Sequence, residues 1–470
     1  MSFYLYDIIF LVVFTLFIIW FLYTRKRNLK REGLLYLYRT SWGIKLINYF
    51  GDKYKGLLKV LSYISITLGY LLMGGIIYLF GKIVYIYIAF PEIVRAIKVP
   101  PIMPLIPYLP KVFNLTFLPP FYFTYWIIIL AIIAIPHEFA HGIFMRLYNV
   151  RIKSTGFGFL GPFLAAFVEQ DEQDLENKSK FQQLAILSAG TFANVLTAIF
   201  FFFILWGFFS MTFVASGVQF DTYSYSLIDL QAVKKIDNIN VQSPTYQSIA
   251  DSFKENNKIN ITTNEGINYI LLKETWLQQN ANQEKYLVYD DAPAINYNLF
   301  GVIKSINGEV IDDTNKLSQE LNRYSSGDEV VIITEMDDGE KEFTIRLDEN
   351  SQTKKPWLGV AFIETRSQGI IGKVYTTLSS FKNPHVYYKP INEFSLFIYN
   401  LLWWVILISI SVALVNMLPV GIFDGGRFFY LTILFFTNNK NVSKKIFSIM
   451  TYFFLILVFL LMVFWAKSFF

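Results

Sequence analysis

The chain of 470 residues contains no cysteine and only three histidines, and both shortages limit its chemistry. Without cysteine there can be no disulfide, no thiolate metal ligand and no cysteine nucleophile. Charged residues are also scarce, at 16% of the chain, against roughly a quarter in a typical soluble domain, whereas hydrophobic residues make up 54%. This composition excludes an ordinary soluble protein and favours a membrane protein.

Long hydrophobic runs account for most of the apolar residues. A helix needs roughly 20 consecutive, mainly apolar residues to cross the hydrocarbon core of a bilayer. Six such runs lie near residues 4–24, 62–90, 121–145, 181–209, 392–420 and 446–467. We therefore predict a mainly α-helical protein with six transmembrane helices, embedded in a lipid bilayer.

The distribution of basic residues predicts the orientation. The first run has no cleavage-site pattern and continues into the basic cluster "TRKRNLKRE" (24–32), so we expect a retained helix. Basic residues collect on the cytoplasmic side, which places this cluster inside and the N-terminus outside. Alternation then puts residues 215–390 and the C-terminus outside. The net charge of +5 is explained by these flanks, so no nucleic-acid partner is expected.

The third run contains "IPHEFAHGIF" (135–144), with three ionisable side chains at membrane depth. Such groups are costly in lipid unless paired or hydrated, so they are functional candidates. His137 and His141 are separated by about 400° of helical rotation, and both imidazoles therefore project from one face. In the HExxH pattern two imidazoles hold Zn²⁺ and the glutamate, here Glu138, takes a proton from water. Chance occurrence is the alternative, but two of the three histidines form this motif.

Two further residues near these features have simpler interpretations. His385, in the polar stretch "KNPHVYY", is interpreted as an ordinary surface histidine. Pro136 has no N–H and leaves a carbonyl one turn earlier without its partner. Either a kink beside the motif or tolerated packing would result.

A third metal ligand is expected far along the chain. Catalytic zinc usually has three protein ligands and an open position, and without cysteine or a suitable third histidine the remaining ligand should be a carboxylate. Asp424, in "NMLPVGIFDGGRFF", is the acid in an apolar stretch that begins near residue 395. Gly425 and Gly426 allow close approach of the backbone. The alternative is that Asp424 caps a helix, and spacing alone cannot establish the pairing.

Three motifs in this order resemble those of the site-2 proteases, which are intramembrane zinc metalloproteases. They are "HEFAH" (137–141), "SAGTFAN" (188–194) and "NMLPVGIFDGG" (416–426). The resemblance implies one Zn²⁺ per chain held by His137, His141 and Asp424, with Glu138 as general base and Asn194 stabilising the oxyanion or positioning substrate. The alternative for Asn194 is a polar residue that joins packed helices, since small residues surround it.

The family core would cover roughly residues 121–210 and 392–435. Within it, "GFGFLGPFLAAFVEQDEQD" (156–174) resembles the membrane-associated β-hairpin of the family. The edge of such a hairpin could pair with an unwound substrate segment by strand addition. The alternative is a membrane-dipping loop without substrate contact.

The polar region from about 215 to 390 predicts an α+β extramembrane insert. "LFGVIKSINGEVIDD" has two strands joined by an Asn307-Gly308 turn, and a helix-like stretch and two more strands follow. This order resembles a PDZ domain, with "PWLGVAF" (356–362) as its closing strand. The similar cadence of "AVKKIDNINVQSPTYQSIADSF" leaves open one PDZ-like unit or two. The insert could capture a peptide as an added strand, or admit by size only substrates already trimmed by another protease.

The predicted function is hydrolysis of a peptide bond within or near a transmembrane helix of a membrane-anchored protein, at a site nearer the cytoplasmic face. A zinc transporter or carrier would explain the ligands but not Glu138, and transporters often show internal repeats that this sequence lacks. A non-proteolytic PDZ-bearing membrane scaffold is the third alternative. The predicted organisation is 1–55 (first helix and basic loop), 56–120 (second helix and external loop), 121–214 (first half of the protease core), 215–390 (PDZ-like region) and 391–470 (second half of the core and last helix).

Overall fold

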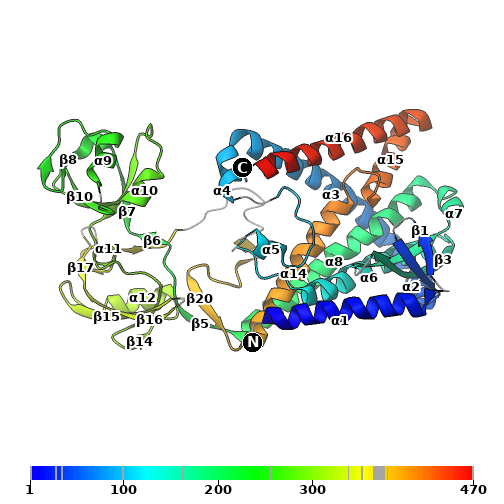
Figure 1. Cartoon of the computed structure of the whole chain (residues 1–470), viewed down its shortest axis with the longest axis horizontal. Coiled ribbons are helices and arrows are strands. Elements are labelled where there is room, and N and C mark those ends of the chain that lie inside the picture. The colour runs from blue at the N-terminus through cyan, green and yellow to red at the C-terminus, as the bar shows by residue number, and fades with distance from the viewer. Residues whose placement is uncertain are drawn as a thin grey trace. The chain divides into compact units, whose positions relative to one another are not determined.

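In the computed structural model the chain forms two compact units (Figure 1). The first unit comprises residues 1–209 and 396–470, and the second unit comprises residues 210–395. The structure describes residues 3–467 apart from 27–28, 33–34, 98–99, 114, 116, 161–162, 255, 337, 351–352, 364–375 and 378. Arg27 of the basic cluster therefore lies outside the described residues.

Six helices among the described residues are long and apolar enough to cross a membrane, which confirms the predicted number. They are α1 (Phe3–Thr24), α3 (Lys55–Ala89), α6 (Phe123–Leu147), α8 (Lys180–Thr212), α14 (Glu393–Asn416) and α16 (Lys440–Lys467). α3 and α16 begin several residues before the predicted runs. Their first turns contain lysines, so hydrophobicity alone marks only the apolar part of each helix.

Shorter helices connect these spans. They are α2 (Ile44–Lys53), α4 (Pro91–Ile97), α5 (Leu109–Val112), α7 (Glu172–Glu176) and α15 (Asp424–Thr437). α2 packs closely on α6, because a Cβ built on Gly142 would lie 2.7 Å from the side chain of Ile47. The absence of a side chain at Gly142 thus sets the distance between α2 and the HExxH helix.

A four-stranded antiparallel sheet belongs to the first unit. Its order is β1-β2-β3-β4, with β1 (Leu29–Glu32), β2 (Leu35–Thr40), β3 (Ile152–Leu160) and β4 (Phe163–Gln170). β3 and β4 form the predicted hairpin, which begins four residues earlier than expected. β1 and β2, in the predicted basic loop, extend this hairpin on the β3 side and leave β4 as an edge strand.

Asp7 attaches α1 to the start of α6. This buried carboxylate accepts hydrogen bonds from the backbone N–H groups of Phe123 and Thr124, at 2.8 and 2.9 Å. It also accepts from the hydroxyls of Thr124 and Tyr108, both at 2.5 Å. Burial, followed by the hydrogen bond to Asp7, raises the pKa of Tyr108, so its hydroxyl remains a donor. Because the first N–H groups of a helix lack partners within it, Asp7 acts as a cap supplied by another helix.

α6 lies between two apolar clusters of the first unit. One holds Ile129 with Trp404 of α14. The other holds Phe144 with Ala185 and Ala189 of α8, where small side chains permit close helix packing. The HExxH helix is thereby packed against α14 near its start and against α8 near its end.

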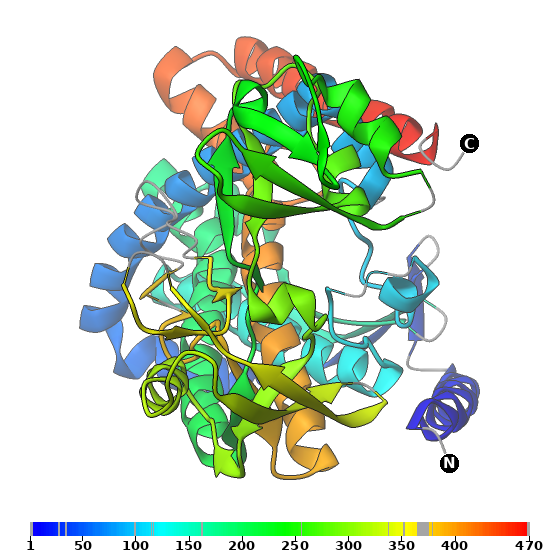
Figure 2. The ribbon, with the colours of Figure 1, turned by 90° about the vertical axis from the view of Figure 1, so that its left-hand side faces the viewer.

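The second unit contains two larger sheets, each with its own apolar core (Figure 2). The first sheet has the order β7-β12-β11-β10-β8-β9, and the second has the order β16-β15-β13-β5-β20 with β14 paired to β13. Asn307 and Gly308 join β13 to β14 with positive φ angles of 48° and 86°, as expected for the predicted tight turn.

The elements of the second unit have the following bounds: β5 (Phe213–Val218), β6 (Thr222–Tyr223), β7 (Tyr225–Ile228), β8 (Val233–Ile236), β9 (Ile239–Asn240), α9 (Tyr246–Ser252), β10 (Lys258–Thr263), β11 (Asn268–Leu272), α10 (Lys273–Leu277), β12 (Tyr286–Asp290), α11 (Pro293–Asn296), β13 (Val302–Ile306), β14 (Glu309–Val310), α12 (Thr314–Leu321), β15 (Glu329–Met336), β16 (Gly339–Arg346), β17 (Asp348–Glu349), β18 (Pro356–Trp357), β19 (Val360–Ala361) and β20 (Val386–Pro390). β17 pairs with β18, and β19 pairs with β6. The predicted closing strand "PWLGVAF" thus supplies two short strands.

Candidate metal centre and active site

Two histidines of α6 and the first residue of α15 converge on one point. The Nε2 atoms of His137 and His141 are 3.1 Å apart, and Asp424 Oδ2 lies 3.4 and 3.3 Å from them. Their three candidate ligand atoms all lie within 4.8 Å of one another. Both histidines are more than nine-tenths buried. The structure therefore brings together the helical pair and the distant carboxylate.

The turn before α15 places Asp424 beside α6. A Cβ built on Gly425 would lie 2.5 Å from the carbonyl oxygen of Met417, so glycine allows the chain to fold back onto the end of α14. The residue that precedes α15 is Phe423, which makes no side-chain capping bond. Asp424 is thus inside the first turn and turns its carboxylate toward the imidazoles.

Both imidazoles are held from behind by α8. The Nδ1 atom of His141 lies 2.7 Å from the carbonyl oxygen of Ile186. A carbonyl can only accept, so His141 donates from Nδ1 and keeps its Nε2 lone pair for a metal. The Nδ1 atom of His137 lies 3.0 Å from the carboxamide nitrogen of Asn194, which is fully buried.

The space in front of the two Nε2 atoms is kept open by a glycine. A Cβ built on Gly190 of α8 would lie 2.5 Å from His137 Nε2 and at least as close to His141 Nε2. Two imidazole nitrogens and a carboxylate oxygen are a donor set typical of catalytic zinc. The ligand set and the cradle at Gly190 therefore fit a zinc ion.

Glu138 lies at the edge of the four-stranded sheet. Its Oε2 atom accepts a hydrogen bond from the backbone N–H of Val168 in β4, at 3.0 Å. Because the other edge of β4 is paired with β3, this bond marks the open edge of the strand. The carboxylate is thus next to the metal ligands in sequence and next to a strand edge in space.

A cavity of about 930 Å³ lies on one face of the sheet and reaches Glu138. Tyr38, Phe157 and Ala166, which are in register across β2, β3 and β4, line it. The segment 40–47, which contains the start of α2, forms another wall. The unpredicted elements at the N-terminal side thereby help to shape the approach to Glu138.

A second cavity, of about 590 Å³, also reaches Glu138 and is lined by His141 and Asp424. Its lining includes Leu37, Gly158 and Ala165, one position along each strand from those of the first cavity, and it shares Ala166, Phe167 and Val168 of β4 with that cavity. Neighbouring residues of a strand point to opposite faces. The two cavities therefore extend over opposite faces of the sheet and meet along β4, beside Glu138.

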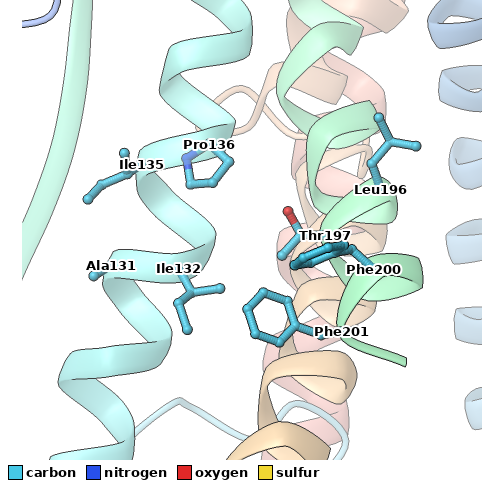
Figure 3. Close-up of a pocket in the computed structure, with 8 residues that line it drawn as sticks. All are labelled: Ala131, Ile132, Ile135, Pro136, Leu196, Thr197, Phe200 and Phe201. Atoms are coloured by element: carbon cyan, nitrogen blue, oxygen red, sulfur yellow. The ribbon is translucent and has the colours of Figure 1, made fainter. Parts of the chain in front are cut away.

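A third cavity, of about 580 Å³, lies between α6 and α8 (Figure 3). Figure 3 shows Ile132 and Pro136 of α6 facing Thr197 and Phe201 of α8. Pro136 lies inside α6, which continues through it. Pro136, which lines this apolar cavity, directly precedes His137 in the sequence. The cavity opens among helices that could span a membrane.

His385 does not belong to the metal-ligand group among the described residues. It lies in the second unit, half-buried rather than fully exposed, with Nδ1 3.3 Å from Asp221 Oδ2. Gly190 and Ile186 were not predicted as site residues. Their positions, four and eight residues before Asn194, are the signal that could have found them, since residues at this spacing share a helix face.

Comparisons with known proteins identify a family for most of the chain. Residues 125–461 match the family described as peptidase family M50. No curated protein sequence matches the chain. A solved PDZ domain of the SdrC-like protein from Listeria monocytogenes is similar to 16% of this chain, at 20% identity and a TM-score of 0.14, over 78% of that domain.

Proposed function

From the premise that the chain belongs to peptidase family M50, the site-2 protease family, we propose that it hydrolyses a peptide bond within or near a transmembrane helix of a membrane-anchored protein. The family is one of zinc-dependent metalloendopeptidases that act on membrane proteins within the bilayer. Six candidate spans fit a multi-pass membrane protein. The observation that carries the proposal is the convergence of His137, His141 and Asp424 beside Glu138.

His137, His141 and Asp424 would hold one Zn²⁺. When bound, zinc supplies Lewis-acid chemistry, which polarises a peptide carbonyl and makes a water molecule a stronger acid. The chain's own contribution is to present two nitrogens and one oxygen from two helices in a buried cage. Ile186 supports this by fixing the hydrogen of His141 on Nδ1.

Glu138 is proposed as the general base. Its carboxylate accepts a proton from the attacking water at one oxygen and passes it to the amide nitrogen as the carbon–nitrogen bond breaks. The hydrogen bond from Val168 N–H fixes the other oxygen and orients the group toward both cavities. The carboxylate would thus be positioned before substrate arrives.

The substrate segment is proposed to add to the open edge of β4. Val168 turns its N–H away from β3, and in an antiparallel ladder alternate residues share this direction, so Ala166 and Leu164 also offer backbone groups to the open edge. A transmembrane helix that unwinds here would regain hydrogen bonds from β4. Its side chains would alternate between the two cavities on opposite faces of the sheet.

The orientation and the role of the second unit are also proposals. The basic cluster supports an N-terminus, a second unit and a C-terminus outside, with the metal centre nearer the cytoplasmic face. The PDZ-like region would either capture a peptide as an added strand or restrict access by size. In the second case the substrate would first be trimmed by another protease.

Glu138→Gln tests the proposal. Zinc content and cleavage of a model transmembrane substrate would be measured on wild type and variant in detergent. We expect about one zinc per chain in both and a loss of cleavage of roughly 10²–10⁴-fold in the variant. Glu169→Gln is the matched control, because Glu169 lines the second cavity but pairs with Arg39 at 3.1 Å.

Three outcomes would contradict the proposal. Wild type without bound metal would favour a scaffold. Transport of zinc by wild type without any cleavage would favour a carrier. Full cleavage by Glu138→Gln would exclude Glu138 as the base. It would not contradict the proposed metal ligands.

A further inference from the structure

One face of α8 lies against both His137 and His141. Ile186, Gly190 and Asn194 are spaced by four residues and therefore lie one above another on α8. Ile186 contacts His141, Asn194 contacts His137, and Gly190 lies between them with no side chain. The three positions together border both imidazoles: Ile186 and Asn194 at Nδ1, and Gly190 at Nε2.

Asn194 and Ile186 present different atoms to the histidines: Ile186 presents a carbonyl oxygen and Asn194 presents a carboxamide nitrogen. The carboxamide nitrogen is the atom 3.0 Å from His137 Nδ1, while the carboxamide oxygen of Asn194 is buried and has no hydrogen-bond partner among the described residues. If the nitrogen donates, His137 carries its hydrogen on Nε2, the atom that faces Asp424. That tautomer cannot offer Nε2 to a metal.

A half-turn of the carboxamide removes this conflict. It exchanges the nitrogen and the oxygen, which are nearly equal in size. The oxygen then accepts from His137 Nδ1–H, and the Nε2 lone pair becomes available.

We infer that Asn194 is a positioning residue: with metal bound, its carboxamide oxygen accepts a hydrogen bond from His137 Nδ1 and holds the ring in the tautomer that ligates through Nε2. This inference rests on the proposed function. It differs from the oxyanion or substrate-positioning role that the family resemblance implied, because Asn194 acts through His137 and is fully buried.

Asn194→Asp and Asn194→Leu separate these roles. Aspartate has the shape of asparagine but only accepts, whereas leucine has similar size and does neither. We expect Asn194→Asp to keep the zinc affinity within about threefold of wild type and Asn194→Leu to lower it by roughly 10–100-fold, the usual effect of removing such a partner. Affinity is measured by competition with a chelator, with cleavage followed in parallel.

The outcomes are distinct. Equal losses of zinc affinity in both variants would overturn the acceptor role, and wild-type affinity in Asn194→Leu would overturn any positioning role. Unchanged affinity with lost cleavage would restore the oxyanion role. Absence of zinc from wild type would instead contradict the proposed function. Thr197→Val is the control for loss of a polar group, since its hydroxyl bonds only to Ala193 O within α8.

Gly190→Ala tests the space beside the two Nε2 atoms separately from Asn194, and it does not remove a polar group. The added methyl would enter the space between the two Nε2 atoms, so we expect at least a tenfold loss of zinc affinity. Gly207→Ala in the same helix is the matched control, because a Cβ there meets nothing within 4 Å. Equal zinc affinity in the two variants would contradict the cradle at Gly190.

Discussion

The two units of this chain use buried polar groups in different ways. In the first unit Asp7, His137 and Asn194 are buried among apolar helices, and each contacts a specific partner. In the second unit a core that includes Ile303 and Ile332 is built from apolar side chains, and polar residues lie mainly outside it. A polar residue is therefore informative in the first unit, where lipid excludes water, and ordinary in the second.

A histidine–aspartate contact occurs in both units and sharpens this comparison. In the first unit Asp424 approaches two histidines, whereas in the second Asp221 approaches His385 alone and also accepts from the N–H of Ile363, at 2.7 Å. The histidine–aspartate distance is 3.3 Å in both units, so this distance alone does not distinguish the two aspartates. The number of converging ligand atoms, rather than the contact itself, distinguishes a candidate metal site.

The largest effect is expected from Asp424→Ala. Removing one of three ligands should lower zinc affinity by more than about 100-fold, beyond the usual loss for an outer partner. Asp221→Ala is the control and should leave zinc affinity unchanged. Both are measured by chelator competition on the full-length protein. Full zinc occupancy in Asp424→Ala would show that another group is the third ligand.

A smaller but substantial effect is expected from Ile332→Ala. Ile332 is fully buried in the core of the later sheet of the second unit, and the cavity should cost about 2–5 kcal/mol of unfolding free energy. Pulse proteolysis in urea measures this loss, with exposed Val310→Ala as control. We expect unchanged zinc affinity, because Ile332 packs within its own unit. A parallel loss of zinc would break the comparison by showing that the two units are coupled.

The sequence predicted the parts of this structure that depend on composition and short spacing. Six spans follow from hydrophobicity, and the facing histidines follow from helical periodicity. β1 and β2 were missed because charges near residues 25–31 dominate that segment and hide its short alternation, and α2 was missed because it is too short to register as an apolar run. Asp7 was missed although a single acid inside a span is itself a signal.

The remaining features depend on tertiary contacts. Asp424 meets α6 only because a Gly-Gly turn folds back on α14, and no spacing rule contains that distance. Gly190 belongs to a stretch rich in small residues, where packing and metal access call for the same residue type. The Asn194 contact with His137 needs the register between α6 and α8, which the sequence does not specify.

A moderate effect is expected from Asp7→Asn in the first unit. Asparagine keeps one acceptor oxygen but presents an NH₂ group to N–H and O–H donors, so we expect a loss of about 2–3 kcal/mol from hydrogen bonds to a charged group. Scanning calorimetry should show a lower unfolding temperature. Thr15→Val is the control, since Thr15 bonds only to Leu11 O within α1. Identical unfolding temperatures of Asp7→Asn and wild type would mean that apolar packing alone holds α1, without a contribution from the hydrogen bonds of Asp7.

The smallest effect is expected from Gly308→Ala, which contrasts with the same change at Gly190. Gly308 has a φ of 86° and open space around it, so alanine would suffer only from its backbone conformation, at about 1–2 kcal/mol. Gly74→Ala, in α3 with nothing within 4 Å, should cost nothing or stabilise slightly. Urea pulse proteolysis reports the stability of each variant and chelator competition its zinc affinity. The distinction between a glycine required by a turn and one required by a metal would be lost if Gly308→Ala lowered the zinc affinity, or if Gly190→Ala left it unchanged.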